Sequence, residues 1–421
     1  MNRLLPLMVL CLAWTAWSLR AATAPSLEIH REGPRNRLVF TGILESATTL
    51  QGPWAPVVGA TSPWWTESDA HGDQYFRSRT EGLFDVRSVV DWFVQGPLQT
   101  HFELAFAGLP DGIFPPKREK PYFDGQVTMG EYDRPASLRV RGNSSLQECP
   151  FPKLKLKLSR QDRVGTPFAT AREIKIGSHC AEGGQGPVGR LRDETATYRE
   201  ALAYEIMEVL GFLSPRVRRA RIEYRDTSPA REGSTTGWQV RRQALLVEDI
   251  EVVGERLGGR ALSDEEITAL RDAGFEDQLL IDLRCFHALL GNWDYSVAQS
   301  GDNLWNTDVV ELPGGKRVPV AGDFDLASWV TGEVRLMAPH DYRPDLEDLT
   351  RQAYFEVNEI RRQTDEAAFA MSQARFEERR SAMESWIATA TLDEPGRSNA
   401  VRHVSVFFEA LAEAAKGGKR E

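Results

Sequence analysis

The chain has 421 residues, more than one ordinary hydrophobic core spans, so more than one domain is expected. With 41% hydrophobic and 27% charged residues, its composition excludes a disordered or fibrous protein. Asp and Glu total 61 against 51 Lys and Arg, and this formal charge of −10 disfavours a nucleic-acid partner held by bulk charge.

Residues 1–24 have the pattern of a secretory signal peptide. Arg3 gives a basic start, Leu4 to Trp17 is an almost unbroken apolar run, and small residues follow at 21–24. The run is too short to span a bilayer comfortably, although an uncleaved anchor is the alternative. No later stretch is apolar enough to cross a membrane, so we expect no transmembrane helix after cleavage.

Residues 25–80 predict a small all-β sandwich, because short apolar runs alternate with Gly and Pro. Trp64 and Trp65 are expected in its core. A linker is expected at 81–100, an α+β body at 101–345 and a helical extension of that body at 346–421. Within the body the pattern predicts strands at Phe102–Phe106, Ser137–Val140, Leu154–Leu158, Arg219–Tyr224 and Gln243–Val247, and helices at 193–212, 263–290 and 348–415.

Three Lys residues alternate with Leu at 153–158, so one face of this strand is apolar and the other carries Lys153, Lys155 and Lys157. Such a ladder is often a solvated sheet edge. The functional alternative is a Lys held against nucleotide phosphates, as kinases hold one on a strand.

Acidic and amide residues gather in two later segments. Asp294 and Asn303 follow the apolar helix that ends at Leu290, and an Asp with a later Asn suits phosphoryl transfer with a divalent cation. Asp323 and Asp325 end a short apolar strand, where their spacing of two places both carboxylates on one face. Turn-forming polar loops are the structural alternative in both places.

The cysteine count is odd once Cys11 leaves with the signal. This suggests one disulfide and one buried thiol. Cys149 and Cys180 flank the Lys-rich segment and are our candidate pair, whereas Cys285 lies in an apolar helical pattern and is expected in a core.

The order of these features is that of a protein-kinase-like core: a Lys strand, a helix with Glu200, a loop with Asp then Asn, and a strand ending in Asp-x-Asp. The Asn follows the Asp by nine residues rather than five, and no Gly-rich G-x-G-x-x-G loop precedes the Lys strand. An ordinary protein kinase is therefore excluded, but an atypical one is not.

The chain resembles the CotH kinase family of atypical secreted kinases, and in particular an outlying branch of exported bacterial proteins. The matching strings run in order from about 101 to 335. They are Val140 to Ser144, Cys149 to Leu156, Lys175 to Cys180, Arg199 to Tyr204, Val247 to Asp249, Gly291 to Ser296, Asn303, and Pro319 to Leu326. The sequence departs from the family pattern at Asp302 and Gly322, where the family has His and Tyr.

The resemblance implies a fold, a reaction and roles for individual residues. Asp294 would be the catalytic carboxylate, and Asn303, Asp323 and Asp325 would bind Mg²⁺ or Mn²⁺ with ATP. Lys155 would contact the nucleotide phosphates, with Glu200 as its partner. The resemblance also supports the Cys149–Cys180 disulfide. The sandwich resembles β-sandwich repeats of secreted bacterial proteins, so a secreted, periplasmic or cell-envelope location in a bacterium is expected.

Three functions follow as hypotheses. The first is an exported kinase that transfers the γ-phosphoryl group of ATP to a hydroxyl of a protein or cell-surface substrate. The second is a catalytically inactive kinase-like module that attaches to the envelope. The third is a structural Ca²⁺-binding domain that uses Asp302, Asp323 and Asp325.

Overall fold

The computed structural model describes most of the chain beyond the predicted signal. The described residues are 25–32, 35–49, 54–57, 60–67, 74–79, 81–107, 120–142, 146, 149–178, 194–230, 233, 236–332 and 348–416. The signal at 1–24 and Cys180 lie outside these ranges. Among the helices in these ranges, none has the length and apolarity to span a membrane.

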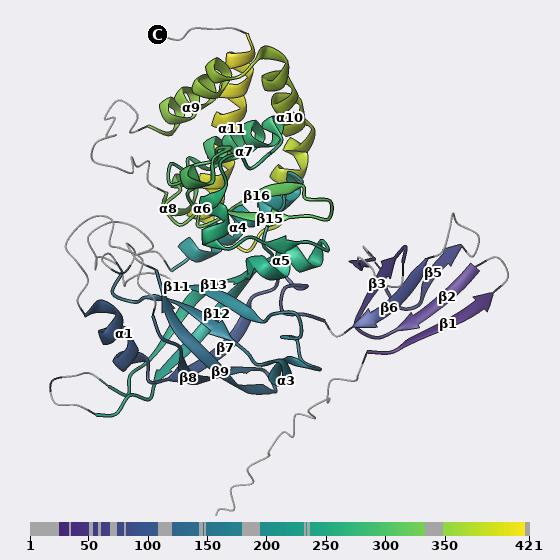
Figure 1. Cartoon of the computed structure of the whole chain (residues 1–421), viewed down its shortest axis with the longest axis vertical. Helices are drawn as coiled ribbons and strands as arrows, with labels where there is room; N and C mark the ends of the chain where they lie inside the picture. The colour runs from purple at the N-terminus through teal and green to yellow at the C-terminus, as the bar shows by residue number, and fades with distance from the viewer. Residues whose placement is uncertain are drawn as a thin grey trace, which may run out of the picture.

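The N-terminal residues form a separate β unit of two three-stranded sheets (Figure 1). One sheet pairs β1 (Leu27–Glu32), β2 (Arg35–Phe40) and β5 (Trp64–Glu67), and the other pairs β4 (Ala55–Pro56), β3 (Ile43–Ala47) and β6 (Tyr75–Arg79). Leu38, Phe40 and Leu44 form the core, and Trp64 packs against it. The expectation for Trp65 was wrong: successive side chains of a strand point to opposite faces, and Trp65 is 45% exposed.

A closed barrel of seven strands forms the first part of the body. Leu154, Leu156, Ile174 and Ile176 belong to its apolar core, so the Lys residues between the Leu residues lie on the outer surface. The strand order around the barrel is β10-β11-β13-β12-β7-β8-β9, and only β7 and β12 pair in parallel. The strands are β7 (Val90–Gly96), β8 (Phe123–Met129), β9 (Tyr132–Arg141), β10 (Lys153–Lys157), β11 (Glu173–Ser178), β12 (Val217–Asp226) and β13 (Gln239–Glu248).

The linker predicted at 81–100 is not a linker, because β7 lies within it and closes the barrel. Its alternation of buried Trp92 and Val94 with more exposed neighbours is the pattern of a strand. The strand predicted at Phe102–Phe106 is instead part of helix α1 (Leu98–Phe106), which buries Leu98, Phe102 and Ala105 at helical spacing. A short apolar run does not by itself distinguish a strand from a helix.

A helical half packs beside the barrel (Figure 1). The body therefore contains both helices and sheets, as the α+β prediction stated. The core of the helical half is continuous through α4, α7 and the three C-terminal helices. The larger helices are α4 (Ala196–Val209), α7 (Asp277–Leu290), α9 (Leu349–Gln363), α10 (Glu366–Thr389) and α11 (Glu394–Ala415). The smaller elements are α3 (Arg160–Arg163), α5 (Ile250–Arg256), α6 (Asp264–Ala269), α8 (Ser328–Thr331), the 3₁₀ turn η1 (Gly301–Asn303) and the sheet of β14 (Arg260–Ala261), β15 (Thr307–Glu311) and β16 (Arg317–Ala321).

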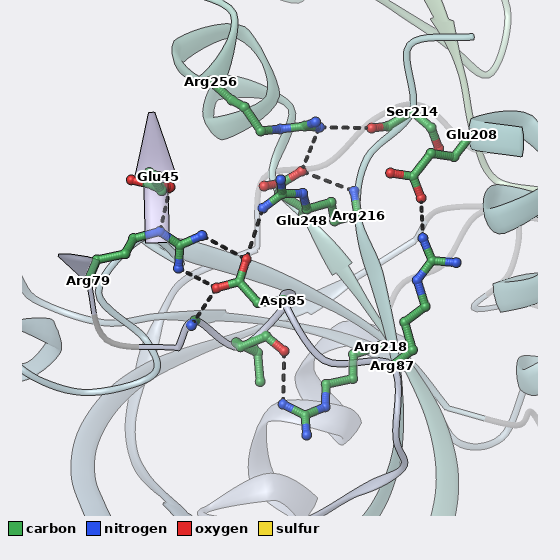
Figure 2. Close-up of polar contacts among 12 residues, drawn as sticks. Glu45, Arg79, Asp85, Arg87, Glu208, Ser214, Arg216, Arg218, Glu248 and Arg256 are labelled. Carbon is green, nitrogen blue, oxygen red and sulfur yellow. Dashed lines mark hydrogen bonds and ion pairs between the residues drawn. The ribbon is translucent and has the colours of Figure 1, made fainter. Parts of the chain in front are cut away.

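Ion pairs connect the β unit to the body, as Figure 2 shows. Arg79 at the end of β6 contacts Glu45 of its own unit and Asp85 of the body. Asp85 also accepts hydrogen bonds from Arg216 and from the backbone N–H of Gly82. Burial raises the pKa of Asp85, but the contacts with Arg79, with the backbone of Gly82 and with Arg216 together lower the pKa below 3.8.

Removing the charge of Asp85 should destabilise the protein because it leaves two guanidinium groups without their shared partner. We expect Asp85→Asn to lower the free energy of unfolding at pH 7 by about 2–4 kcal/mol, measured by urea titration. The loss should shrink as the pH falls below 3.8, because a carboxylate with a lowered pKa stabilises the fold only while it is ionised.

The matched control is Asp91→Asn. Asp91 also contacts two arginines, Arg221 and Arg241, but its side chain is 59% exposed. We expect it to change the free energy of unfolding by less than about 1 kcal/mol. If the two variants lost equal amounts of unfolding free energy, a structural role for the buried contacts of Asp85 would be contradicted.

Candidate functional site

A cavity of about 400 Å³ lies between the outer surface of the barrel and the helical half. The barrel contributes residues from β9, β10, β11 and β13. The remaining lining comes from α4, α6, the segment from the loop after α7 through η1 to the start of β15, and the segment after β16. The polar and aromatic side chains that line it are Arg141, Lys153, Lys175, Glu200, Tyr204, Asp264, Thr268, Asp294, Trp305, Asn306, Thr307, Asp308, Asp323 and Asp325.

Two lysines pair with acidic residues of this cavity: Lys175 with Asp308 at 3.8 Å, and Lys153 with Asp323 and Asp325. Lys153 is 7% exposed, and its Nζ lies 3.0 Å from Oδ1 of Asp323 and 2.8 Å from Oδ2 of Asp325. Burial alone would lower the pKa of Lys153, but the charges of Asp323, Asp325 and Glu200 raise it above its ordinary value. The ammonium group therefore stays charged and joins the barrel to the segment after β16.

Lys155, the lysine predicted to contact phosphates, lies elsewhere on the same strand face. It pairs with Glu173 on β11 and, at 3.3 Å, with Asp249 at the start of α5, and it is not among the lining residues. The alternation at 153–157 correctly indicated which face carries the lysines. It does not indicate which end of that face meets the helical half, and this is why Lys153 was missed.

Asp323 and Asp325 lie on one side of a short loop, as their spacing indicated. Phe324 between them is fully buried and packs edge-on against Tyr204, with ring centroids 4.8 Å apart. The backbone N–H of Asp323 donates to the hydroxyl of Tyr204 at 2.9 Å. The charge of Lys153 lowers the pKa of Asp323 to about 2, so this carboxylate is ionised at neutral pH.

Glu200 lies on α4 next to this pair. It is 5% exposed, and within the described ranges it makes no hydrogen bond or ion pair. Burial raises the pKa of Glu200 to about 8, against the opposing charge of Lys153. In this arrangement Lys153 is committed to the two aspartates, and Glu200 is largely protonated at neutral pH.

The loop that carries Asp294 begins at the C-terminal cap of α7. Gly291 has a φ of 56°, and a Cβ atom there would lie 2.1 Å from Oγ of Ser328, so both the backbone conformation and the space require glycine. Asn292 accepts the backbone N–H of Asp294 at 3.1 Å and donates through Nδ2 to Nδ1 of His287 at 3.0 Å. Burial lowers the pKa of His287 to about 3, so its ring is neutral and Nδ1 can accept. The loop after α7 therefore contains an Asx turn at Asn292, and it also places Asp294 in the cavity.

The carboxylate of Asp294 is held by aromatic and amide neighbours. Trp305 donates from Nε1 to Oδ1 at 2.7 Å, and Asn306 donates from Nδ2 to the backbone carbonyl at 2.8 Å. Burial raises the pKa of Asp294 to about 6, and the charges of Asp325 and Asp323 act in the same direction. The carboxyl group of Asp294 therefore titrates close to neutral pH.

Asn306, rather than the predicted Asn303, is the amide that lines the cavity. Asn303 ends the exposed turn η1 and is not among the lining residues. Asn306 and Asp323 have φ values of 50° and 56°, and no other non-glycine residue in the ranges given above has a positive φ. Both lie in this cavity, and rare backbone conformations of this kind concentrate at functional sites.

The donor set suits a divalent cation bound together with phosphates. Among the described residues no three His, Cys, Asp or Glu side chains form a ready-made metal cluster. Mg²⁺, however, usually takes one or two protein carboxylates plus phosphate oxygens, and Asp323 is ionised and 41% exposed with Asp325 beside it. Asp302 instead contacts Ser300 and Arg271, so the three aspartates of the Ca²⁺ hypothesis do not all line this cavity.

The observed states of Cys149 and Cys285 match the sequence-based predictions. Cys149 is disulfide-bonded, and Cys285 is a fully buried free thiol in the helical core. Because Cys180 lies outside the described ranges, its pairing with Cys149 stays a prediction. Cys149 precedes the Lys153 strand by four residues and packs against the core of the helical half.

Comparisons with known proteins give only distant structural likenesses. No protein-family model and no curated protein matches the chain. The crystal structure of a proinflammatory kinase, CtkA, from Helicobacter pylori aligns with a TM-score of 0.34 and 11% identity, over 62% of this chain and 94% of that one. The resemblance to the CotH kinase family therefore stays a prediction, and function has to be inferred from the site itself.

The raised pKa of Asp294 has a consequence for stability. An acid whose folded-state pKa is raised from 3.8 to about 6 destabilises the fold when ionised, fully above pH 6 and not below 3.8. We expect Asp294→Asn to raise the free energy of unfolding by about 1–3 kcal/mol at pH 8 and to leave it unchanged at pH 3.5, in urea titrations.

Asp302→Asn is the control, because Asp302 is on the same loop but its side chain is 45% exposed. It should have little effect at either pH. If Asp294→Asn lowered the free energy of unfolding at pH 8, the ionised carboxylate would be stabilising the fold, and the prediction would be wrong.

Proposed function

We propose that this protein is an exported, metal-dependent phosphotransferase of the atypical kinase type, similar to the CotH kinase family. It transfers the γ-phosphoryl group of ATP to a hydroxyl of a protein or cell-surface substrate. One observation carries the proposal: a buried Lys153 on a barrel strand bridges Asp323 and Asp325, beside Glu200 on a helix and in the same cavity as Asp294.

The barrel wall suits the nucleotide phosphates. Arg141, Lys153 and Lys175 are the charged residues that the barrel strands place in the cavity, and all three are cations. When phosphate oxygens enter, Lys153 can exchange its contact with the aspartates for a contact with the phosphates. Glu200, already beside it, then becomes its carboxylate partner as its proton is lost.

A divalent cation, if bound with the nucleotide, would be held by carboxylates that line the cavity. Asp323 and Asp325 are the residues that would hold it, with Asn306 as the amide in reach of the same cavity. When bound with ATP, Mg²⁺ or Mn²⁺ supplies charge neutralisation for the transferred group.

Asp294 is suited to accept the proton of the attacking hydroxyl. A base works best when its pKa is close to the working pH, and the pKa of Asp294 is about 6. The acceptor oxygen bonds to the γ-phosphorus, the bond from that phosphorus to the bridging oxygen breaks, ADP leaves, and the acceptor proton passes to Asp294. Trp305 and Asn306 hold this residue in place.

Export accounts for two features outside the cavity. A signal sequence at 1–24 would direct the chain out of the cytoplasm, and a disulfide at Cys149 is the chemistry of an oxidising compartment. We infer a secreted, periplasmic or cell-envelope bacterial location.

Nucleotide binding can be tested by thermal unfolding. We expect ATP with Mn²⁺, at about ten times its dissociation constant, to stabilise the wild type by about 1.4 kcal/mol, a rise in Tm of about 1.5–2 °C for a chain of this length. Asp323→Ala should abolish the rise.

Lys153→Met should also abolish the rise, and Lys155→Met should retain it. Because Lys153→Met leaves two acids without their cation, Lys153→Arg, which keeps the charge, serves as a second variant and should weaken binding without unfolding. No rise at millimolar ATP would contradict the proposal and favour the non-enzymatic surface module.

Phosphoryl transfer is tested separately with ATP labelled at the γ-phosphate. Asp294→Ala should retain the thermal response to ATP and Mn²⁺ but lower phosphate incorporation by at least about 100-fold. Asp302→Ala should keep both. Full activity in Asp294→Ala would remove this residue from the mechanism.

A further inference from the structure

Tyr204 connects α4 to the segment that carries the proposed metal ligands. It lies four residues after Glu200 on this helix, so the two side chains share one face. Tyr204 is 5% exposed, lines the cavity and packs edge-on against Phe324. Its hydroxyl accepts the backbone N–H of Asp323 at 2.9 Å. One side chain of the helix therefore contacts both the backbone and the buried ring of the segment from Asp323 to Asp325.

The backbone of Asp323 depends on such a contact because its conformation is a costly one. Asp323 has a φ of 56°, in the left-handed region that residues with a side chain disfavour. The residue before it, Gly322, donates its N–H to the carbonyl of Asn306 at 3.0 Å, and Asn306 donates from Nδ2 to the carbonyl of Asp294 at 2.8 Å. These hydrogen bonds connect the proposed base to the Asp323 segment, and the bond to Tyr204 connects that segment to α4.

Within the described ranges, Asp323 is held by direct polar contacts with Lys153 and with Tyr204. Lys153 pairs with its carboxylate at 3.0 Å, whereas Tyr204 holds its backbone. In the proposed reaction, Lys153 leaves the carboxylate and contacts the nucleotide phosphates. Burial raises the pKa of Tyr204 well above its ordinary value, so its hydroxyl stays neutral and its bond to Asp323 does not depend on the charge of Lys153. The contact with Tyr204 can therefore persist when Lys153 moves.

We propose that Tyr204 is a positioning residue of the metal site. When the nucleotide phosphates take Lys153, the hydroxyl of Tyr204 keeps Asp323 in its left-handed conformation, so that the carboxylate still faces the cavity and can bind Mg²⁺ or Mn²⁺. Gly322 has no side chain that competes for this space, since a Cβ atom there would already lie 3.4 Å from the hydroxyl. This role rests on the proposed function.

The test is Tyr204→Phe, which keeps the ring and removes the hydroxyl. The dissociation constant of ATP would be measured by calorimetry on the full-length protein without residues 1–24, once with Mn²⁺ and once with EDTA in its place. We expect Mn²⁺ to tighten ATP binding to the wild type at least about tenfold. In Tyr204→Phe the constant with Mn²⁺ should rise about fivefold or more, because the metal ligand is no longer held in place, and the constant in EDTA should stay within about twofold.

Tyr198→Phe is the matched control. Tyr198 lies on the same helix and is 7% exposed, but its hydroxyl donates to the carbonyl of Ala220 at 3.3 Å and the residue does not line the cavity. It should leave both dissociation constants within about twofold. Both variants should fold, with a Tm within about 5 °C of the wild type, since each loses one hydrogen bond.

Hydrogen exchange tests the contact in the protein without any ligand. Tyr204→Phe should speed exchange of the Asp323 amide about tenfold or more, followed by mass spectrometry on a peptide that contains residues 319–327, and Tyr198→Phe should not. Exchange at the wild-type rate in Tyr204→Phe would overturn the proposed role.

Failure of this role and failure of the proposed function give different results. If Mn²⁺ tightens ATP binding equally in the wild type and in Tyr204→Phe, the kinase stands and the role of Tyr204 is overturned. Equal weakening with Mn²⁺ and in EDTA, or a Tyr204→Phe variant that does not fold, would make the hydroxyl a support of the whole fold and would also overturn it. A wild type that binds no ATP under either condition overturns the kinase and the role together.

Discussion

The contact of Lys153 with Asp323 and Asp325 is the interaction on which the site depends. The barrel has an apolar core inside it, and a second core joins the helical half to Val217, Leu245 and Val247 on the outside of the barrel. The contact of Lys153 crosses the same boundary with charged groups. An ammonium group that is 7% exposed would cost several kcal/mol without partners, so in the folded chain Asp323 and Asp325 offset the cost of covering Lys153 with the helical half.

Three acids in this cavity titrate in different ranges because their surroundings differ. Asp323, next to an ammonium group, has a pKa of about 2, Asp294 among buried neighbours has one of about 6, and Glu200, fully enclosed, has one of about 8. At neutral pH one is a fixed anion, one exchanges its proton and one is mostly neutral. Pairs of acids whose pKa values are driven apart in this way divide the roles of ion binding and proton transfer.

The sequence could predict which strands, helices and loops contribute to the cavity. It could not predict which residue along each of them lines it. Asp294, Glu200, Asp323 and Asp325 do share one cavity, since motif order and a spacing of two constrain them strongly. The lysine that lines the cavity is Lys153 and not the predicted Lys155, because strand alternation gives a face and not a position along it. The amide that lines it is Asn306 and not the predicted Asn303, because Asn303 is exposed at the end of the turn η1. The barrel was not anticipated, since its closure depends on pairing between β7 and a strand more than 120 residues later.

The left-handed backbone at Asn306 and Asp323 has an energetic consequence for the fold. Glycine would adopt both conformations at no steric cost, whereas a side chain there costs of order 1 kcal/mol or more. Neither residue is needed to fill a core. Glycine at either position would also lose a contact, either the hydrogen bond from Asn306 to the backbone carbonyl of Asp294 or the ion pair of Asp323 with Lys153. The same side chains that strain the backbone therefore hold the lining of the cavity together.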